Sequence, residues 1–412
     1  MSLNKSSRWV RCYRKGGFSA TNVSRLKHQA KLFVGNQLGR ILSKQYSRGK
    51  GTASRLISIY SEELKRNGVK PNILVFPVPV KKVAAQYFLD GEIESEYRRR
   101  LFSGESFTNK AGIVSARNVD VSFPTSMHQI GNYILKEIMS GPHVLTNPKY
   151  LFGLEAIRFK KKRPMNEGVL LSMPWHHNFY HWMIEMLPRL ISYDRCPSLQ
   201  NIPLIVPKSA PGFVAESLRL AGYLSKTIFL EDGAYRFNKL HMLSMLVSTT
   251  EVSLDAVNWL NKKFANVPSS LISPKRIYVS RRDANIHFVA NEAQLTNVLA
   301  EYGFETLVMS GLSLADQINV FRSAEYIIGP HGAALANLAF SKPGATIIEF
   351  FFRGHYAACF NRISGIRALK YGFLVGEPAG IGGFSINQSQ LRAVLSQALP
   401  RYFNGENAIC PV

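Results

Sequence analysis

The chain has 412 residues, of which 46% are hydrophobic and 11% aromatic, enough for two or three packed domains. Charged residues make up only 19%, which excludes wholesale disorder. Lysine and arginine outnumber acidic residues by 51 to 27, so the formal net charge is +24. This excess favours a negatively charged partner: nucleic acid, an anionic membrane face or a phosphorylated substrate.

Cysteine content and hydropathy indicate the compartment. The four cysteines lie far apart and form no C-x-x-C pair, so we expect neither a disulfide framework nor a cysteine-based zinc site. No apolar run approaches the roughly 18 residues that span a membrane, and the longest, residues 73–80, contains two prolines. No apolar signal segment follows the basic N-terminus. These features predict a cytoplasmic protein.

Residues 1–70 form a basic N-terminal extension, with sixteen lysines and arginines and two acidic residues. Apolar residues between Val23 and Leu42 approximate a helical period and are flanked by basic residues. Two interpretations stay open. The segment is a basic amphipathic helix on the inner face of an anionic membrane, or a surface helix packed on the main body with a solvated basic face.

The next part of the chain, residues 71–260, alternates between strand and helix patterns. Strands are predicted at 73–76, 169–173, 203–206, 227–230 and 240–243, and helices at 178–191 and 211–221. The second helix has a proline at its start and Gly222 after its end. Such alternation predicts a parallel sheet with crossover helices.

Residues 261–412 repeat this alternation more clearly. Strands are predicted at 276–280, 304–309, 326–328 and 346–350, and helices at 291–303, 313–324, 333–340 and 388–399. Asn291 is the expected N-cap of the first helix, and Ser313 with Asp316 resembles a capping box. We expect a domain boundary between 252 and 274, and a C-terminal helix that crosses back to the first domain.

A small-residue loop, Gly329 to Ala334, follows one of these strands and opens a helix. Open α/β sheets bind ligands at this place, and the N–H groups of Gly332 and Ala333 at the helix start favour a phosphate. His331 would add a donor. The alternative is a tight turn leading into a small-residue helix packed on the sheet.

Arg281 and Arg282 end another strand of the same half. Their guanidinium groups match the geometry of a diphosphate, and the loop from Gly329 should lie on the same sheet edge. The alternative is a surface ion pair between Arg282 and Asp283.

Glu349 closes the strand one βα unit later. A carboxylate there is placed to accept hydrogen bonds from ribose hydroxyls. The alternative is an ion pair with Arg353 or Arg362.

The densest group of chemically active residues lies between Trp175 and Glu185. In a helix from residue 178, His181 and Glu185 share one face, with Arg189 a turn further along. Either the carboxylate holds the imidazole as a general base, or Glu185 is the base and His181 binds substrate. A histidine satisfied in an aromatic core is the structural alternative.

No metal or other cofactor is expected. His177 and His181 have a metal-ligand spacing, but zincins need glutamate directly after the first histidine, where this chain has Asn178. No Asp-x-Asp motif, which would hold a diphosphate through a divalent ion, occurs in the chain. Arginine, histidine and helix N–H groups would then meet the leaving-group charge.

Taken together and in order, these motifs resemble glycosyltransferase family 61 over residues 169–376. The matching positions are Asn178 to Trp182, Glu185, Leu187 to Arg189, Ser280 to Ala284, Asn291 with Glu292, Gly303 to Glu305, Gln317, Phe321, Ile328 to Asn337, Pro343 with Gly344, and Glu349. Residues 1–140 carry no such resemblance.

The resemblance implies an α/β fold of the GT-B type, with two Rossmann-like domains facing a cleft. It also implies inverting transfer without an essential metal. The family often has a further arginine where this chain has residues 285–287, so that phosphate contact differs. Without a secretory signal, the chain looks like bacterial members that make capsular or other surface polysaccharide.

The sequence therefore predicts a glycosyltransferase that moves a sugar from a nucleotide sugar, expected to be UDP-linked, to a glycan or lipid-linked acceptor. Glu185 or His181 is the base. The donor is held by Arg281, Arg282, His331, Gly332, Ala333 and Glu349, while His177, Trp182 and Arg189 contact the acceptor or sugar. For Trp182, stacking on a sugar ring and a position in the core stay open as alternatives. The alternatives are a nucleic-acid-binding protein, for which no binding motif is present, and a nucleotide-sugar-binding protein without turnover.

Overall fold

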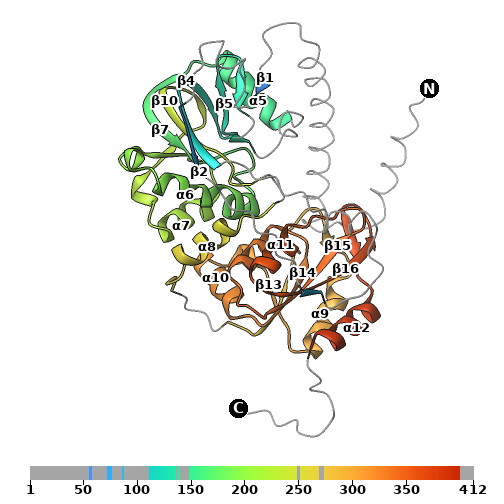
Figure 1. Ribbon diagram of the computed structural model, residues 1–412. Helices are drawn as coiled ribbons and strands as arrows, with labels where there is room; N and C mark the ends of the chain where they lie inside the picture. Colours follow the sequence, from blue (N-terminus) through green and yellow to red (C-terminus); the bar gives the residue numbers. More distant parts are fainter. Residues whose placement is uncertain are drawn as a thin grey trace, which may run out of the picture.

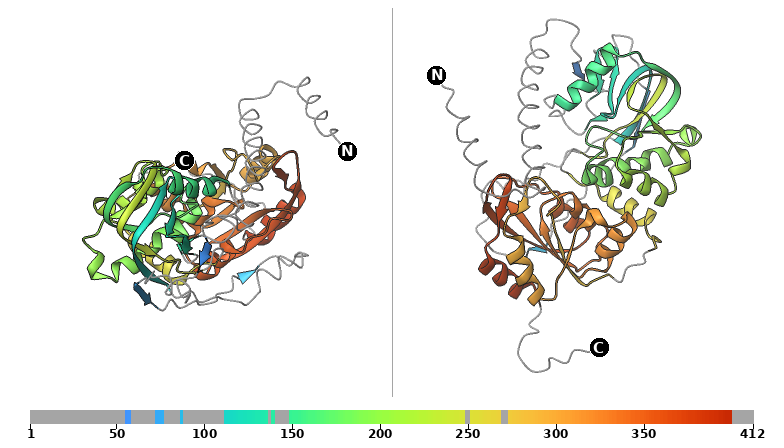
Figure 2. Two further views of the ribbon diagram at one scale, coloured as in Figure 1. Left: turned by 90° about the horizontal axis from the view of Figure 1, so that it is seen from above. Right: turned by 180° about the vertical axis from the view of Figure 1, so that it is seen from behind.

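The computed structural model describes residues 55–57, 72–76, 86–87, 111–135, 138–139, 148–247, 251–268 and 273–399. Within them the chain forms a mixed α/β structure with two sheets, as predicted (Figure 1). Helices α6, α7 and α8 lie between the two sheets (Figure 2). The predicted amphipathic helix in residues 23–42 lies outside the described residues.

The first sheet has the strand order β1-β6-β5-β4-β10-β7-β8-β9, with β2 beside β4. Its strands are β1 (Arg55–Ile57), β2 (Asn72–Phe76), β4 (Ala111–Phe123), β5 (Met127–Ile130), β6 (Tyr133–Leu135), β7 (Arg163–Leu170), β8 (Leu204–Pro207), β9 (Thr227–Leu230) and β10 (Gly233–Leu243). Strands β10, β7, β8 and β9 are parallel, while β4 runs antiparallel to β10. The predicted strand 240–243 is only the end of β10, whose earlier half carries exposed polar residues that hid the apolar alternation.

The second sheet has the order β12-β17-β16-β15-β14-β11-β13, with β3 beside β16. Its strands are β3 (Gln86–Tyr87), β11 (Arg276–Val279), β12 (Phe288–Val289), β13 (Glu305–Leu307), β14 (Tyr326–Pro330), β15 (Thr346–Phe352), β16 (Lys370–Pro378) and β17 (Gly383–Ser385). The strands from β13 to β16 are parallel. Because β11 lies between β13 and β14, the direction of winding reverses there. The carboxyl ends of β11 and β14 thus border a topological switch point, where open α/β sheets bind ligands.

Helices connect and cover the strands. They are α5 (Pro148–Phe159), α6 (Leu190–Asp194), α7 (Gly212–Leu220), α8 (Leu254–Lys263), α9 (Glu292–Glu301), α10 (Leu314–Ser323), α11 (Cys359–Ile366) and α12 (Gln388–Ala398). Tighter or wider turns form η4 (His181–Met186), η5 (Leu187–Arg189), η6 (Pro197–Leu199), η7 (Leu224–Lys226), η8 (Met309–Gly311) and η9 (Ala333–Phe340).

The two predicted helix caps have different outcomes. The Ser313 hydroxyl accepts from the N–H of Asp316 (3.1 Å), so its role as a side-chain cap is confirmed. The Asp316 carboxylate accepts from the Ser313 hydroxyl (2.6 Å) and not from its backbone N–H, so the reciprocal bond of a capping box is not formed. Asn291 stands at the N-cap of α9, but its side chain bonds the backbone of Ile386 on both sides (2.8 and 3.1 Å). The predicted side-chain cap is wrong because this amide ties α9 to the segment after β17.

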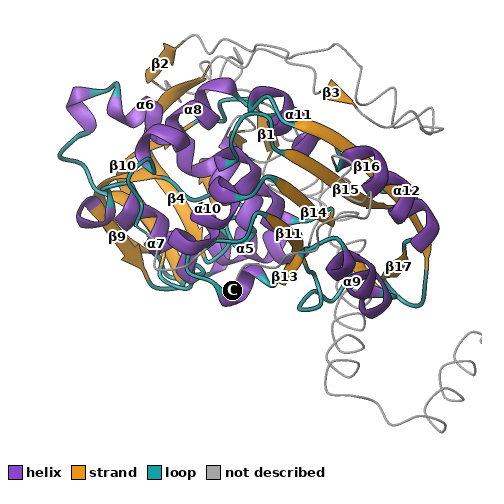
Figure 3. Cartoon of the chain, turned by 90° about the horizontal axis from the view of Figure 1, so that it is seen from below, coloured by secondary structure: helices purple, strands orange, loops and turns teal. Residues whose placement is uncertain are grey.

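The C-terminal helix stays with the second sheet. Leu391, Val394 and Leu395 of α12 join Leu295 and Leu299 of α9 in one buried cluster, and Figure 3 shows the two helices together. The predicted crossing to the first domain is wrong, because the apolar face of α12 is already covered by α9. The two sheets are nevertheless linked to the N-terminal part of the chain, since β1 pairs with β6 and β3 with β16.

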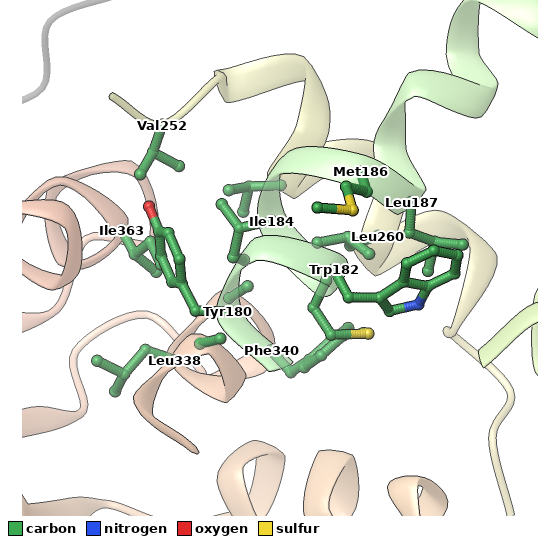
Figure 4. Packing of buried hydrophobic residues seen from close by; sticks show 14 of the residues in the cluster. Tyr180, Trp182, Ile184, Met186, Leu187, Val252, Leu260, Leu338, Phe340 and Ile363 are labelled. Atoms are coloured by element: carbon green, nitrogen blue, oxygen red, sulfur yellow. The ribbon is translucent and has the colours of Figure 1, made fainter. Parts of the chain in front are cut away.

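The largest hydrophobic cluster takes side chains from both sheets and from the helices between them. Figure 4 shows its middle, where Tyr180 and Ile184 of the first half meet Leu338 and Ile363 of the second. Helix α8 packs beside them through Leu260. Side chains of the two halves are therefore packed against one another at this place.

Candidate active site

The segment after β7 forms an unusual helix. The side-chain oxygen of Asn178 accepts hydrogen bonds from the N–H groups of two residues that follow, at 2.9 and 3.3 Å. From His181 to Met186 the backbone is a π-helix, in which the N–H of Leu187 donates to the carbonyl of Trp182. The predicted helix is thus present, but as successive π, 3₁₀ and α turns. Single π turns are rare in proteins, and those that occur are often found at functional sites.

His181 and Glu185 form a close pair in this helix, which we call the first dyad. Nδ1 of His181 lies 2.6 Å from Oε2 of Glu185, and their side chains are 20% and 1% exposed. Oε1 of Glu185 is buried and has no partner among the described residues. With Glu185 ionised, Nδ1–H donates to it, and Nε2 is left with the lone pair that accepts a proton. The imidazole is therefore the accessible member of the dyad.

Arg189 is fully buried, so its predicted contact with acceptor or sugar is wrong. Its guanidinium donates to the carbonyls of Leu171 and Leu243, and its Nε donates to that of Met186 (3.3 Å). Burial lowers the pKa of Arg189 to about 9, against the raising effect of nearby Glu185. Still protonated at neutral pH, this guanidinium ties the ends of β7 and β10 together and balances the buried carboxylate.

Trp182 is also fully buried, and its Nε1–H donates to the hydroxyl of Ser217 at 2.8 Å. Of the two roles predicted for Trp182, the core position is confirmed and stacking on a sugar is wrong. Figure 4 shows the indole on the side of the helix away from Tyr180.

The indole beside the first dyad belongs to Trp175, which the sequence did not single out for this role. Its ring lies 5.8 Å from that of His181 and stacks 5.9 Å from that of His177, which is exposed. The backbone of Trp175 has a φ of +76°, a conformation that is costly for a large side chain and is often kept at functional sites. Trp175 and His177 are thus the aromatic groups at the mouth of this dyad.

A second dyad stands at the end of β14. Nδ1 of His331 lies 2.5 Å from Oε1 of Glu349, and the Tyr371 hydroxyl donates to Oε2 at 2.6 Å. Glu349 and Tyr371 lie on the adjacent strands β15 and β16, and His331 directly follows β14, which pairs with β15. The side chain of Glu349 is 0% exposed, whereas that of His331 is 17% exposed. Again a buried carboxylate holds an accessible imidazole.

The predicted contact of Glu349 with ribose is wrong, because both of its oxygens are occupied and it is closed to solvent. The alternative ion pairs are wrong too, since Arg353 pairs with Glu377 and Arg362 with Glu251. Glu349 therefore acts on the site through His331.

Arg281 lies against the small-residue loop, as the shared sheet edge predicted. A Cβ on Gly332 would fall 1.7 Å from Nη1 of Arg281, so only glycine leaves room for the guanidinium there. Nη2 of Arg281 donates to the carbonyl of Ile286 at 3.2 Å, while its Nε is buried without a partner among the described residues. Burial lowers the pKa of Arg281. Ala333 follows as the first residue of η9, whose first N–H groups have no partner within the helix.

Arg282 differs from its neighbour. Its side chain is exposed, and its backbone N–H donates to the Ser280 hydroxyl at 3.2 Å. The alternative pair with Asp283 is absent from the described contacts, since Asp283 instead accepts a hydrogen bond from Ser310 at 2.6 Å. The structure brings one arginine of the pair, Arg281, to the loop.

Two histidines that the sequence did not single out complete this cationic side. The ring of His355 lies 4.7 Å from that of His287 and 5.6 Å from that of His331. The pKa of His287 is lowered to about 4, first by burial and then by nearby His355, Arg281 and His331. Added positive charge is therefore unfavourable in this cluster, and an anion bound beside Arg281 would offset that cost.

Aromatic contacts join the two dyads. The ring of Phe360 lies 4.9 Å from that of His331 and 5.6 Å from that of Tyr180, which is 5.5 Å from the ring of His181. Burial raises the pKa of the Cys359 thiol, and the charges of Glu349 and Glu185 raise it further. One thiol thus lies near both carboxylates, so the two dyads lie in one region of the molecule.

The family model of glycosyltransferase 61 matches residues 179–348. This part of the chain is a glycosyltransferase family 61 domain. The chain is therefore a glycosyltransferase that uses a sugar donor and an acceptor, as predicted. No curated protein matched the chain.

The family 61 domain contains the first dyad, both arginines and the His331 loop, while Glu349 and Tyr371 lie beyond its end. Within the described residues, no group of three or more His, Cys, Asp or Glu side chains is arranged to hold a metal ion. None of the described helices is long and apolar enough to span a bilayer.

Proposed function

We propose that the chain is an inverting glycosyltransferase, which moves a sugar from a UDP-sugar to a hydroxyl of a glycan or lipid-linked glycan. We place it in bacterial surface polysaccharide synthesis, on the cytoplasmic side of the membrane. The observation that carries the proposal is the meeting of a solvent-accessible His–Glu dyad with a cationic switch-point loop through Phe360 and Tyr180. The two sheets would be the two halves of a GT-B arrangement.

His181 is the proposed base. Glu185 is 1% exposed and has one oxygen on the imidazole, so the imidazole is the member that an acceptor hydroxyl can reach. Nε2 of His181 takes the hydroxyl proton as the acceptor oxygen bonds to the anomeric carbon and the bond to the diphosphate breaks. Glu185 orients the ring and stabilises the imidazolium that forms. A single displacement of this kind inverts the anomeric configuration.

The donor diphosphate is proposed to lie at the carboxyl ends of β11 and β14. Arg281 supplies a fixed guanidinium whose Nε has no partner in the described part of the chain, and the first N–H groups of η9 supply neutral donors. His331, backed by Glu349, offers a third group at the same loop. These donors would stabilise the charge that develops on the leaving diphosphate, so no essential metal is proposed.

The acceptor is proposed to enter beside Trp175 and His177. Trp175 presents an aromatic ring next to His181, and a flat ring is suited to stack on the apolar face of a sugar. The net positive charge is compatible with nucleic-acid binding, but no binding motif accompanies it, and no observation favours binding of a nucleotide sugar without turnover.

The test is to incubate the protein with a panel of nucleotide sugars, with and without EDTA, and to follow donor consumption and the anomeric configuration of the product by NMR. We expect UDP-sugars to be consumed in EDTA and the anomeric configuration to invert. Retention of configuration would contradict the single displacement, and loss of all turnover in EDTA would contradict metal independence. Stabilisation of the protein by UDP in a thermal shift assay would report donor binding separately.

A further inference from the structure

Helix α5 has one face fixed on the first sheet. Tyr150, Leu154 and Ile157 are buried and share a cluster with Met127 of β5. A Cβ on Gly153 would fall 2.2 Å from the Thr125 hydroxyl, so the helix backbone lies directly on the turn between β4 and β5 at this point. These contacts determine which side of α5 faces outward.

The outward face of α5 carries two large phenyl rings. Phe152 is 54% exposed. Phe159 is 78% exposed, which is more than any other large apolar side chain in the described part of the chain. Seven residues apart, they lie about 20° from one another around the helix axis and roughly opposite the buried residues. Two aligned phenyl rings so far out of the core form an apolar stripe that neither the fold nor the proposed reaction uses.

Basic residues surround the end of this stripe. Five of the six residues from Arg158 to Arg163 are lysine or arginine, and no acidic residue occurs between positions 156 and 166. Lys162 pairs with Asp120 at 3.5 Å, and Arg163 donates to the Tyr235 hydroxyl at 2.9 Å. Lys160 and Lys161 are exposed, and neither has an acidic partner among the described residues.

We propose that this surface, the outer face of α5 with residues 158–163, docks on an anionic lipid bilayer. Phe152 and Phe159 would enter the boundary between headgroups and acyl chains, while Lys160 and Lys161 meet the headgroup phosphates. A stripe of large apolar residues bordered by lysine and arginine is the pattern of interfacial membrane helices. Charge alone would suit nucleic acid equally well, but the phenyl stripe favours lipid.

The inner face of the same helix leads to the active site. The Tyr150 hydroxyl accepts from the N–H of Trp175 at 3.1 Å, and Trp175 lies beside His181. Docking through α5 would therefore hold the acceptor side of the first dyad near the bilayer, which suits an acceptor carried on lipid. This last consequence rests on the proposed function, whereas membrane docking itself does not.

The experiment measures co-sedimentation of the full chain with vesicles of phosphatidylcholine, alone or mixed with phosphatidylglycerol, at low and high NaCl. We expect binding to the mixed vesicles, with a salt-resistant part that depends on the phenyl rings. Phe152→Ser with Phe159→Ser should lower the salt-resistant partition about tenfold, because the apolar area that enters the bilayer is lost. Lys160→Ser with Lys161→Ser should lower the salt-sensitive part. Ile381→Ser, at a 58% exposed site on the second half, is the matched control and should change neither.

Insertion is measured directly with Phe159→Trp. Mixed vesicles should shift its fluorescence to the blue, and brominated lipids should quench it beyond the quenching of the parent protein. Unchanged partition of the double phenylalanine variant, or no added quenching, would overturn the proposal. The proposal would also be overturned if the double phenylalanine variant lost binding to single-stranded nucleic acid while its binding to vesicles was unchanged. Donor consumption in solution should stay normal in all these variants, so failure here is distinguishable from failure of the proposed transfer reaction.

Discussion

The two His–Glu dyads share one design but differ in how their carboxylates are satisfied. Each imidazole presents Nδ1 to a buried glutamate, at 2.6 Å in the first dyad and 2.5 Å in the second. Glu349 also accepts from Tyr371, so both of its oxygens are bonded. Glu185 has one oxygen without a partner among the described residues, and buried Arg189 lies nearby.

This difference separates the roles that we propose for the two histidines. A carboxylate bonded on both sides fixes a ring in one position, which suits a group that holds an anion. A carboxylate balanced by a buried guanidinium can follow the change of charge on its imidazole, which suits a base that gains a proton in each turnover. Variants that disturb one dyad at a time can break or sharpen this distinction.

The largest effect is expected in the first dyad. His181→Ala should lower kcat about a thousandfold, the usual scale for a lost general base, while Glu185→Gln should lower it roughly tenfold to a hundredfold. Steady-state kinetics of donor consumption would measure both, with circular dichroism to check folding. If Glu185→Gln is the more damaging change, Glu185 is the base and the assignment is reversed.

The adjacent arginines provide a matched pair. Arg281→Ala should weaken UDP binding by about tenfold to a hundredfold, because a charged hydrogen-bonding group at the loop is lost. Arg282→Ala should change it less than about twofold, because its side chain is exposed and, unlike that of Arg281, is not among the atoms that pack against Gly332. Isothermal titration calorimetry at constant ionic strength would measure both. Equal losses would mean that the diphosphate does not lie on Arg281.

A smaller effect is expected behind the second dyad. Tyr371→Phe removes the hydroxyl that donates to Glu349 and should lower kcat several-fold while leaving the acceptor KM unchanged. Tyr278→Phe is the control, because it removes a comparable hydrogen bond, from the Tyr278 hydroxyl to Glu292 (2.9 Å), that does not involve His331 or Glu349. Both should lower the free energy of unfolding by about 2 kcal/mol. An equal kcat in the two variants would assign Tyr371 a purely structural role.

The smallest effect concerns pH. Because the folded chain lowers the pKa of His287 from 6.5 to about 4, the unfolded chain binds this proton more tightly. The contribution of neutral His287 to the free energy of unfolding is therefore complete above about pH 6.5 and is lost as the pH falls toward 4. Asparagine tolerates the φ of +54° at this position. The Tm of His287→Asn should therefore fall less than the Tm of the parent protein when the pH is lowered from 7 to 5. A parallel loss would show that this imidazole does not contribute.

Much of the second sheet could be predicted because its signals are local. Gly303 after α9 and the side-chain cap at Ser313 fix element ends within a few residues. The partners of the Asn291 amide and of α12 could not be predicted, because each lies just under a hundred residues away along the chain, 95 residues in the case of Asn291. The π form of η4 was likewise hidden, since i, i+4 spacing suits α and π turns alike.

In the site too, contacts set by local sequence signals could be predicted and contacts set by distant packing could not. The spacing of His181 and Glu185 predicted their contact, and the shared sheet edge predicted that of Arg281 with the Gly332 loop. Which tryptophan is buried was not predictable, because Trp175 and Trp182 differ only in what packs over them. The bond from His331 to Glu349 depends on strand register, which places Glu349 beside Gly329.

The hydrophobic cluster that joins the two sheets limits how this enzyme can be recombined. A chimaera that takes its donor half from one relative and its acceptor half from another would place foreign side chains at the seam where Tyr180 and Ile184 meet Leu338 and Ile363. Shape complementarity there, rather than the identity of the sugar pocket, would decide whether the hybrid folds. Successful exchanges should carry η4, η9 and α11 across as one block.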